Sequence, residues 1–308
     1  MTASNSITRR QFIAAGAALA GSLVLPATAG STSTAIKKAI PKSGELLPVI
    51  GMGTSRTFDD SGDPQYIALL RDVTQTFFDL GGGMIDSSPM YGSAQQVLGE
   101  ILPQIDNRQS LFAATKVWTR GKQAGEQQME HSRQLWGINR FDLMQIHNLV
   151  DWETHLQTLR RMKAEGKIRY IGITTSHGRF HENLSSILKQ HDIDFLQLSY
   201  NIVDREAEQP LLSIALDKGI AVIVNRPYQR GSLFRLVRGK PLPDWAEEID
   251  CTSWGQYFLK FTVSHPAVTC AIPATSKVRH MRDNMHAGMG RLPDAGQRLK
   301  MIRYLESL

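Results

Sequence analysis

Short apolar, β-branched runs recur along most of this 308-residue chain, and a longer amphipathic segment follows nearly every one. Eight runs are candidate strands: Val49–Gly53, Met84–Ser87, Leu111–Val117, Phe141–His147, Tyr170–Thr174, Phe195–Tyr200, Ala221–Asn225 and Thr269–Ile272. The segments between them predict helices over Pro64–Leu80, Ala94–Leu102, Glu126–Trp136, Trp152–Glu165, Arg179–Lys189, Glu206–Asp217 and Ser253–Val263. This alternation in one domain predicts an α/β fold, the (β/α)8 TIM barrel, over residues 44–308.

A doubly wound sheet is the alternative, and it would carry a Gly-x-Gly-x-x-Gly turn directly after its first strand. Here Gly51-Met52-Gly53 is followed by Thr54-Ser55-Arg56, and the glycines at 81–83 precede a strand rather than a helix. The sequence also has no zinc-ligand spacing and no Walker loop. We therefore favour the barrel and expect no metal site.

The first 29 residues have the anatomy of an export signal. Two arginines, Arg9 and Arg10, precede an apolar segment, Phe12–Leu25, which is short for a membrane span. An Ala-x-Ala cleavage site ends at Ala29. We interpret residues 1–29 as a twin-arginine signal peptide, with an ordinary secretory signal or an uncleaved anchor as alternatives. The twin-arginine machinery is then a partner, and the mature protein is periplasmic or otherwise exported and outside the membrane. Residues 30–43 read as a flexible lead-in.

Charge and cysteine content limit the partners. Loss of Arg9 and Arg10 with the signal lowers the formal net charge from +6 to +4, and no basic stripe accompanies it, so no nucleic-acid partner is expected. The chain has two cysteines, Cys251 and Cys270, and the apolar run around Cys270 is typical of a buried thiol. The sequence leaves their pairing open. We expect a monomer.

Polar residues end several of the strands, and in a parallel barrel the carboxyl ends of the strands carry the functional site. Asp86 ends the second strand and Tyr91 lies in the loop after it. Lys116 ends the third strand and His147 ends the fourth. All four side chains therefore fall on one rim and on neighbouring strands.

These four residue types have the separate roles that carbonyl reduction needs. No protein side chain donates hydride, so a cofactor must supply it. Tyr91 is the candidate general acid, and the Lys116 ammonium lowers its pKa, which is ~10 in a free tyrosine. Asp86 holds Lys116 in place, and His147 donates a hydrogen bond that orients the carbonyl.

At these residues the chain resembles the aldo-keto reductase family. Gly82–Gly92 is similar to the family signature Gly-x-x-x-Asp-Ser/Thr-Ala/Ser-x-x-Tyr-Gly, and the runs ending at Lys116 and His147 resemble its lysine and histidine strands. Ile272–Asn284 resembles its cofactor segment, and the resemblance covers nearly all of residues 45–290. It implies a metal-free (β/α)8 barrel that uses NADPH to reduce aldehydes or ketones, with the four residues above as its catalytic set.

The resemblance also implies a cofactor site. Its residues are Thr174, Gln197, Arg226, Arg230, Ser232, Thr275, Lys277, His280 and Asn284. Thr174 and Gln197 match positions that hold the nicotinamide carboxamide, and Asn284 matches an asparagine that contacts adenine. The loop Arg226–Leu233 wraps the pyrophosphate with its backbone N–H groups and Arg230.

Five residues depart from the family pattern. Thr174-Thr175 replaces Ser-Asn, Asn225 replaces an aromatic residue that stacks on the nicotinamide, and Ala274 replaces a lysine. His280 replaces an arginine that meets the 2′-phosphate, although Lys277, Arg279 and Arg282 keep this end basic. We expect NADPH to be preferred by a reduced margin, with NAD(H) as the second cofactor.

The sequence supports two alternative functions, one enzymatic and one non-catalytic. The first is an NAD(P)H-dependent reductase of a small carbonyl substrate, with Tyr91 as general acid. The second is a non-catalytic nucleotide-binding barrel that serves as a redox sensor or interaction module. The complete catalytic set favours the enzyme, whereas export away from the cytoplasmic NADPH pool favours the module. The sequence does not identify the substrate.

Overall fold

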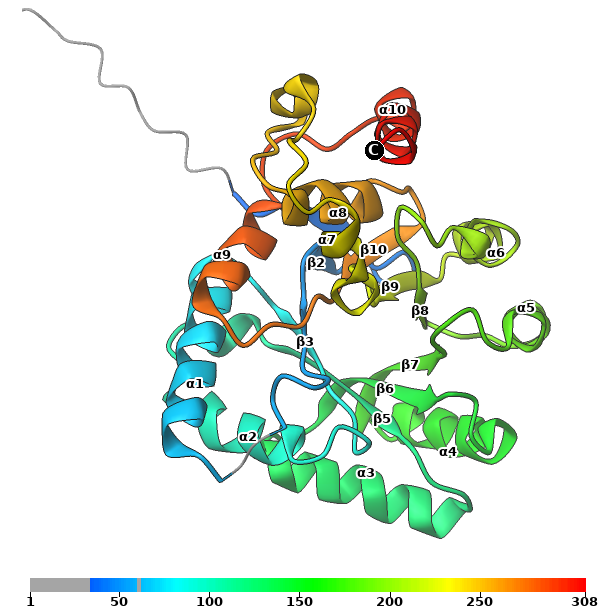
Figure 1. Cartoon of the computed structure of the whole chain (residues 1–308). Helices are drawn as coiled ribbons and strands as arrows, with labels where there is room; N and C mark the ends of the chain where they lie inside the picture. Colours follow the sequence, from blue (N-terminus) through cyan, green and yellow to red (C-terminus); the bar gives the residue numbers. More distant parts are fainter. Residues whose placement is uncertain (1–33, 60–61) are drawn as a thin grey trace, which may run out of the picture. The chain divides into compact units, whose positions relative to one another are not determined.

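The structure is a computed structural model that describes residues 34–59 and 62–308, so the predicted signal peptide lies outside the described residues. Within that part of the chain, eight parallel strands follow one another around a sheet (Figure 1). The strands are β3 (Met52–Gly53), β4 (Met84–Asp86), β5 (Phe112–Val117), β6 (Phe141–His147), β7 (Ile168–Thr174), β8 (Phe195–Ser199), β9 (Ala221–Asn225) and β10 (Val268–Ala271). The predicted (β/α)8 barrel is confirmed.

The first and last strands close the sheet. Parallel bridges join Ile50 to Ala271 and Gly53 to Ala274. A Cβ atom on Gly53 would lie 2.7 Å from the Ile272 carbonyl oxygen, so a side chain at this position would push the closing strands apart. Glycine is therefore required where the barrel closes.

The helices between and after the strands are α1 (Pro64–Asp79), α2 (Ala94–Ile101), α3 (Lys122–Trp136), α4 (Trp152–Ala164), α5 (His181–Gln190), α6 (Leu211–Asp217), α7 (Ser232–Leu236), α8 (Trp254–Val263), α9 (Val278–His286) and α10 (Ala295–Glu306). Short 3₁₀ helices cover Leu102–Gln104, Arg108–Ser110, Glu206–Glu208, Gln229–Gly231 and Asp244–Ile249. Six of the seven predicted helices are present with ends that shift by a few residues, whereas the predicted helix Glu206–Asp217 is divided at Gln209 and Pro210 into a 3₁₀ helix and α6. Local signals explain several ends: Asp63 caps α1 ahead of Pro64, and Gly137 ends α3 in a left-handed conformation.

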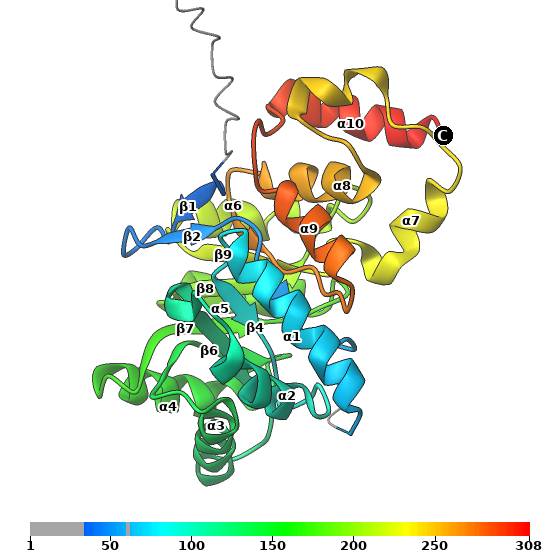
Figure 2. The same ribbon diagram turned by 90° about the vertical axis from the view of Figure 1, so that its left-hand side faces the viewer.

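Before the barrel, β1 (Lys37–Ala39) and β2 (Leu46–Pro48) form an antiparallel pair (Figure 2). Ile40 is fully buried, and Lys38 donates hydrogen bonds to the carbonyls of Val263, His265 and Val268 at 2.7–2.9 Å. Residues 37–40 are therefore a packed part of the fold, where the sequence predicted a flexible lead-in. The polar composition did not predict this packing, because the Lys38 ammonium is satisfied by carbonyls between the end of α8 and the start of β10.

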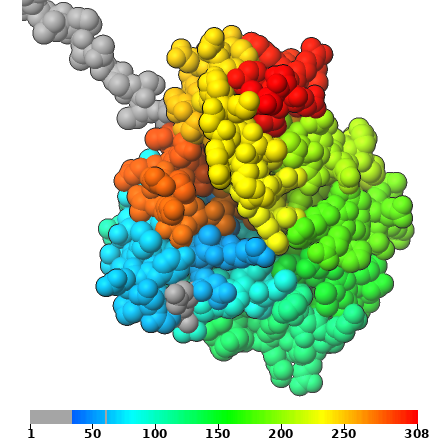
Figure 3. Space-filling view, in the orientation of Figure 1, coloured from blue at the N-terminus to red at the C-terminus, as the bar shows by residue number. Residues whose placement is uncertain are grey.

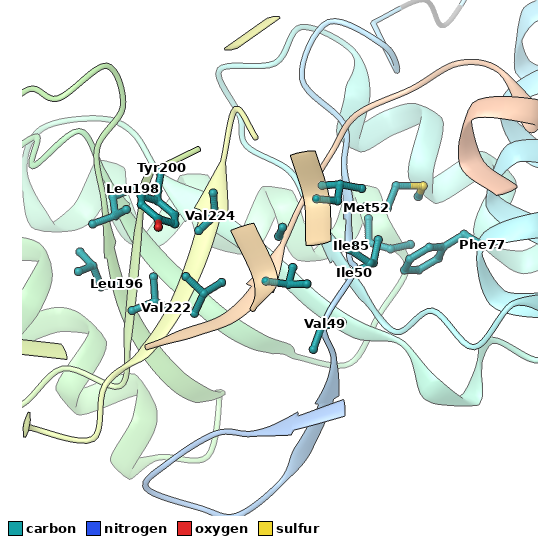
Figure 4. Close-up of a cluster of buried hydrophobic side chains, with 14 of the residues drawn as sticks. Val49, Ile50, Met52, Phe77, Ile85, Leu196, Leu198, Tyr200, Val222 and Val224 are labelled. Atoms are coloured by element: carbon teal, nitrogen blue, oxygen red, sulfur yellow. The ribbon is translucent and has the colours of Figure 1, made fainter. Parts of the chain in front are cut away.

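Alternate residues of the strands point into the barrel and change character along its axis. One buried cluster consists of Ile40, Leu47, Met84, Phe112, Ala114, Leu143, Tyr170, Phe195, Ala221, Ile223, Cys270 and Ile272. Two or four residues further along the same strands stand Asp86, Lys116, Gln145, His147, Thr174 and Gln197, all buried. The side-chain period of two thus places an apolar layer below a polar one. The other strand faces pack against the helices in a second cluster (Figure 4).

Residues 226–253 connect β9 to α8 and contain α7. In Figure 3 this segment, coloured yellow, lies between the orange α9 and the green part of the chain.

Cys251 and Cys270 are both free, buried thiols, which settles the pairing that the sequence left open. No helix among the described residues is long and apolar enough to cross a bilayer.

Candidate active site

Asp86 and Lys116 form a buried ion pair at the polar end of the barrel. Lys116 Nζ donates to Asp86 Oδ2 at 2.5 Å and to the Ser87 carbonyl at 2.8 Å. The side chain of Lys116 is 0% exposed and that of Asp86 is 2% exposed. Burial lowers the pKa of Lys116, but Asp86 and Tyr91 raise it more, so the net shift is upward and the ammonium persists. A permanent positive charge is therefore fixed inside the barrel.

Two glutamines complete the surroundings of Asp86. Gln145 Nε2 and Gln197 Nε2 donate to Asp86 Oδ1 at 2.8 and 2.9 Å, and Gln197 Nε2 also lies 3.2 Å from Gln145 Oε1. The carboxylate is thus held from β5, β6 and β8. Gln145 was missed at the sequence level, although its place two residues before His147 on β6 marks it as inward-facing.

Tyr91 lies beside this ion pair. Lys116 Nζ is 5.0 Å from the centroid of the Tyr91 ring, and the ring meets that of His147 edge-on at 5.9 Å. Burial raises the pKa of Tyr91, Lys116 lowers it, and Asp86 raises it, with a net upward shift. The sequence argument considered only the ammonium and expected a lowered pKa, and this direction is wrong because burial outweighs the ammonium. The phenol is therefore protonated at neutral pH, the form that a proton donor needs.

His147 ends β6 with its Nδ1 2.9 Å from Ser88 Oγ. Burial, followed by repulsion from Lys116, lowers the pKa of His147 to about 3. The imidazole is therefore neutral at neutral pH. The Trp118 ring centroid lies 6.4 Å from that of His147, and Trp118 is 41% exposed. Neither Ser88 nor Trp118 was predicted from the sequence, and both follow strand ends that the sequence had identified.

Thr174 and Gln197 lie next to this group. Thr174 Oγ1 donates to Gln197 Oε1 at 3.1 Å, which connects both side chains to Asp86. Asn225, at the position of the family's stacking aromatic residue, donates from Nδ2 to the Thr175 carbonyl at 2.9 Å and accepts from Ser199 Oγ at 2.7 Å. Asn225 therefore ties β9 to β7 and β8 and offers no ring for stacking.

The loop after β9 carries concentrated positive charge. Arg226 Nε is buried and has no hydrogen-bond partner within the described residues. The pKa of Arg226 is lowered, mainly by burial. The positive charges of Arg230, Arg56 and Arg179 lower it further, whereas Asp204 raises it. Several guanidinium groups thus face one carboxylate, and an orphaned buried donor among them fits an anion such as a dinucleotide pyrophosphate. Ser232 sits in the same loop, where its hydroxyl donates to the Gln229 carbonyl at 2.9 Å.

The remaining predicted cofactor residues lie on the segment from β10 to α9. Thr275 is buried and its hydroxyl accepts from the Lys277 N–H at 3.1 Å just before α9. Asn284 is buried on α9 and accepts from the Tyr228 hydroxyl at 2.6 Å, which joins α9 to the loop after β9. Burial, Arg279 and Lys277 lower the pKa of His280. The predicted cofactor residues thus lie beside Asp86, in the basic loop after β9, and on α9 with the segment before it.

Comparisons with known proteins identify a family and a set of similar structures. A sequence model of the Aldo/keto reductase family matches residues 49–296. Methylglyoxal reductase YeaE of Escherichia coli is 26% identical over 80% of this chain and 88% of its own length. The NADH-specific methylglyoxal reductase of Escherichia coli is 27% identical over 50% of this chain and 54% of its own. An aldo/keto reductase from Klebsiella pneumoniae, solved with NADP and acetate, superposes with a TM-score of 0.74 at 22% identity, covering 88% of this chain and 95% of the other.

Proposed function

This chain belongs to the aldo/keto reductase family, and we propose that Tyr91 is the proton donor with which it reduces an aldehyde or ketone to an alcohol. The observation that carries the proposal is the placement of the Tyr91 ring beside both His147 and the buried Asp86–Lys116 pair. A bound nicotinamide dinucleotide supplies the hydride. The protein supplies the proton and holds the carbonyl.

Each side chain has a role that its surroundings support. The Tyr91 hydroxyl is protonated at neutral pH and gives its proton to the carbonyl oxygen. The Lys116 ammonium stabilises the phenolate that results, and Asp86 fixes Lys116. Neutral His147 donates a hydrogen bond to the carbonyl oxygen.

We propose NADPH as the preferred cofactor and NADH as the second. Lys277, Arg279 and Arg282 support a 2′-phosphate site on α9 and the loop before it, where a forked guanidinium suits a phosphate. Ala274 and His280 reduce the margin, because the chain lacks two further cations there. One relative is named an NADH-specific enzyme, which is consistent with a family that accepts both cofactors.

The substrate that we propose to test first is methylglyoxal, because two relatives are named methylglyoxal reductases.

We also propose that residues 1–29 are a twin-arginine signal and that the mature protein is an exported monomer. The non-catalytic module is less favoured, since it would not need the partly buried Tyr91 beside the buried Asp86–Lys116 pair.

The test is turnover by the purified full chain, followed through the reduced-nicotinamide absorbance with methylglyoxal and a panel of other aldehydes and ketones. Replacing Tyr91 with Phe should lower kcat by roughly 10²–10⁴-fold while the dissociation constant of NADPH stays within about twofold. Tyr304→Phe, on helix α10, is the matched control, because within the described residues the Tyr304 hydroxyl donates to the Pro241 carbonyl and makes no other hydrogen bond. Tight NADPH binding with no turnover of any carbonyl would favour the non-catalytic module instead.

A further inference from the structure

We propose that Ser88 is a positioning residue that fixes the tautomer of His147, so that the proton sits on Nε2 and points to the substrate. This inference rests on the proposed function, in which His147 donates a hydrogen bond to the carbonyl. Ser88 lies two residues after Asp86, at the end of a strand two places from β6 in the sheet. Ser88 is neither one of the four catalytic residues nor one of the predicted cofactor residues.

Ser88 is fully buried, and its hydroxyl makes two hydrogen bonds within the described residues. Its side chain is 0% exposed, and its Oγ lies 2.9 Å from His147 Nδ1. The Met90 N–H donates to the same Oγ at 3.2 Å. Within the described residues, no other hydrogen bond of the Ser88 hydroxyl is found. The hydroxyl oxygen therefore accepts from Met90 and must place its own proton elsewhere.

Counting protons decides the direction of the contact with His147. A hydroxyl has one proton to donate, and a buried donor without an acceptor is disfavoured. His147 Nδ1 is the acceptor within reach, and it accepts only when it carries no proton. If Nδ1 were protonated, it would donate to the second lone pair of Ser88 Oγ, and the Ser88 proton would then have no acceptor. The geometry thus selects the tautomer with the proton on Nε2.

The tautomer matters because His147 carries a single ring proton at neutral pH. Burial and Lys116 lower its pKa to about 3, so the doubly protonated ring, which could donate from either nitrogen, is not populated at neutral pH. Nδ1 is already committed to Ser88. Nε2 is then the nitrogen left to meet a carbonyl oxygen, and it is useful only if it holds the proton.

The first measurement uses the full chain labelled with ¹⁵N-histidine, where the His147 signals are assigned by their loss in His147→Asn. We expect the wild type to show an unprotonated Nδ1 and a protonated Nε2. In Ser88→Ala the two tautomers should mix, and Ser88→Thr, which keeps the hydroxyl, should restore the wild-type pattern. Ser132→Ala is the control, because it also removes a buried serine hydroxyl. That hydroxyl accepts a 3.1 Å hydrogen bond from Gln95 and does not contact His147.

The second measurement is kinetic. Ser88→Ala should lower kcat/KM for the carbonyl by about tenfold at saturating NADPH, the cost of one hydrogen bond of roughly 1.4 kcal/mol. NADPH affinity should be unchanged and Ser132→Ala should match the wild type. Ser88→Thr should recover most of the rate, which a general packing defect would not allow.

A wild-type spectrum with the proton on Nδ1 would overturn the proposal, and it needs no variant that might fail to fold. An unchanged tautomer in Ser88→Ala would overturn it as well. If the tautomer shifts as expected but the wild type reduces no carbonyl, the Ser88 assignment is supported and the proposed reductase function fails. The two proposals are therefore tested separately.

Discussion

Gln145 Nε2 donates to Asp86 Oδ1 at 2.8 Å, on the oxygen opposite to the one that Lys116 binds. The buried carboxylate thus has a charged partner on one oxygen and neutral donors on the other. Such complete pairing is what makes a buried charge tolerable, because an uncompensated one costs several kcal/mol. The same arrangement connects the ion pair to Gln197 on β8, which donates to both Asp86 and Gln145.

The ion pair should therefore be important for stability as well as for chemistry. Lys116→Met leaves the Asp86 charge buried without its cation and should lower the free energy of unfolding by about 3 kcal/mol. Adding Asp86→Asn to that variant should recover much of the loss, since no net charge then remains buried. Urea unfolding measures both effects. Arg71→Met, which removes an exposed pair with Asp72, is the control and should change stability by less than about 0.5 kcal/mol. Equal losses for the buried and exposed pairs would contradict the argument.

The period of two along the strands explains how much of the site the sequence predicted. Asp86, Lys116 and His147 stand where apolar runs end, so strand order alone placed them on one rim. Gln145 stands in the same inward series, but its partner Asp86 is 59 residues away, and nothing local shows that the two meet. Sequence patterns place a residue on a strand face but do not give its contacts across the barrel.

Two other features were not predictable because they depend on burial. The upward pKa shift of Tyr91 arises mainly from desolvation, which the sequence does not report. Strand β1 was not predicted, because Lys37 and Lys38 are residues typical of a solvated segment. In the structure, Lys38 donates hydrogen bonds to three backbone carbonyls. Both errors came from treating a polar residue by its type rather than by its surroundings.

The pH dependence of reduction follows from the same shifts. Reduction needs Tyr91 protonated, and burial raises its pKa above the usual ~10, so the active form is lost only when the pH rises beyond that value. His147, with a pKa of about 3, does not titrate near neutrality. We therefore expect kcat/KM at saturating NADPH to be nearly flat from roughly pH 5 to 9. A pH–rate profile in the reductive direction tests this. A bell-shaped profile with a limb near pH 6.5 would show that a histidine titrates in the step.

The export signal makes a prediction that is independent of catalysis. Replacing Arg9 and Arg10 by Lys keeps the charge but removes both guanidinium groups, which lysine does not mimic. If the pair is read as a twin-arginine signal, the precursor should remain in the cytoplasm, as measured by fractionation and immunoblotting. In the wild type the exported protein should begin at residue 30. Arg71→Lys, a matched change in α1, should export normally. Normal export of the twin-lysine variant would assign residues 1–29 to the general secretory route.

The choice between NADPH and NADH should depend on His280 at low pH. Burial, Arg279 and Lys277 lower the pKa of His280 below its usual ~6.5, so its positive charge is present only in acid and is lost as the pH rises through that lowered value. NADPH affinity should therefore fall with rising pH in the mildly acidic range and level off by neutrality, and NADH affinity should change less. His280→Arg should restore a permanent charge and tighten NADPH binding by about tenfold at pH 7.

The controls for this prediction lie on the same helix. His280→Gln should remove the pH dependence, whereas His286→Gln, at an exposed position in the last turn of α9, should not. Dissociation constants for both cofactors, measured by fluorescence titration across the pH range, decide the outcome. Equal affinities for NADPH and NADH at every pH, with no response to His280→Arg, would mean that the basic residues around α9 face solvent rather than a phosphate. The cofactor would then be selected by its pyrophosphate alone, through the basic loop after β9.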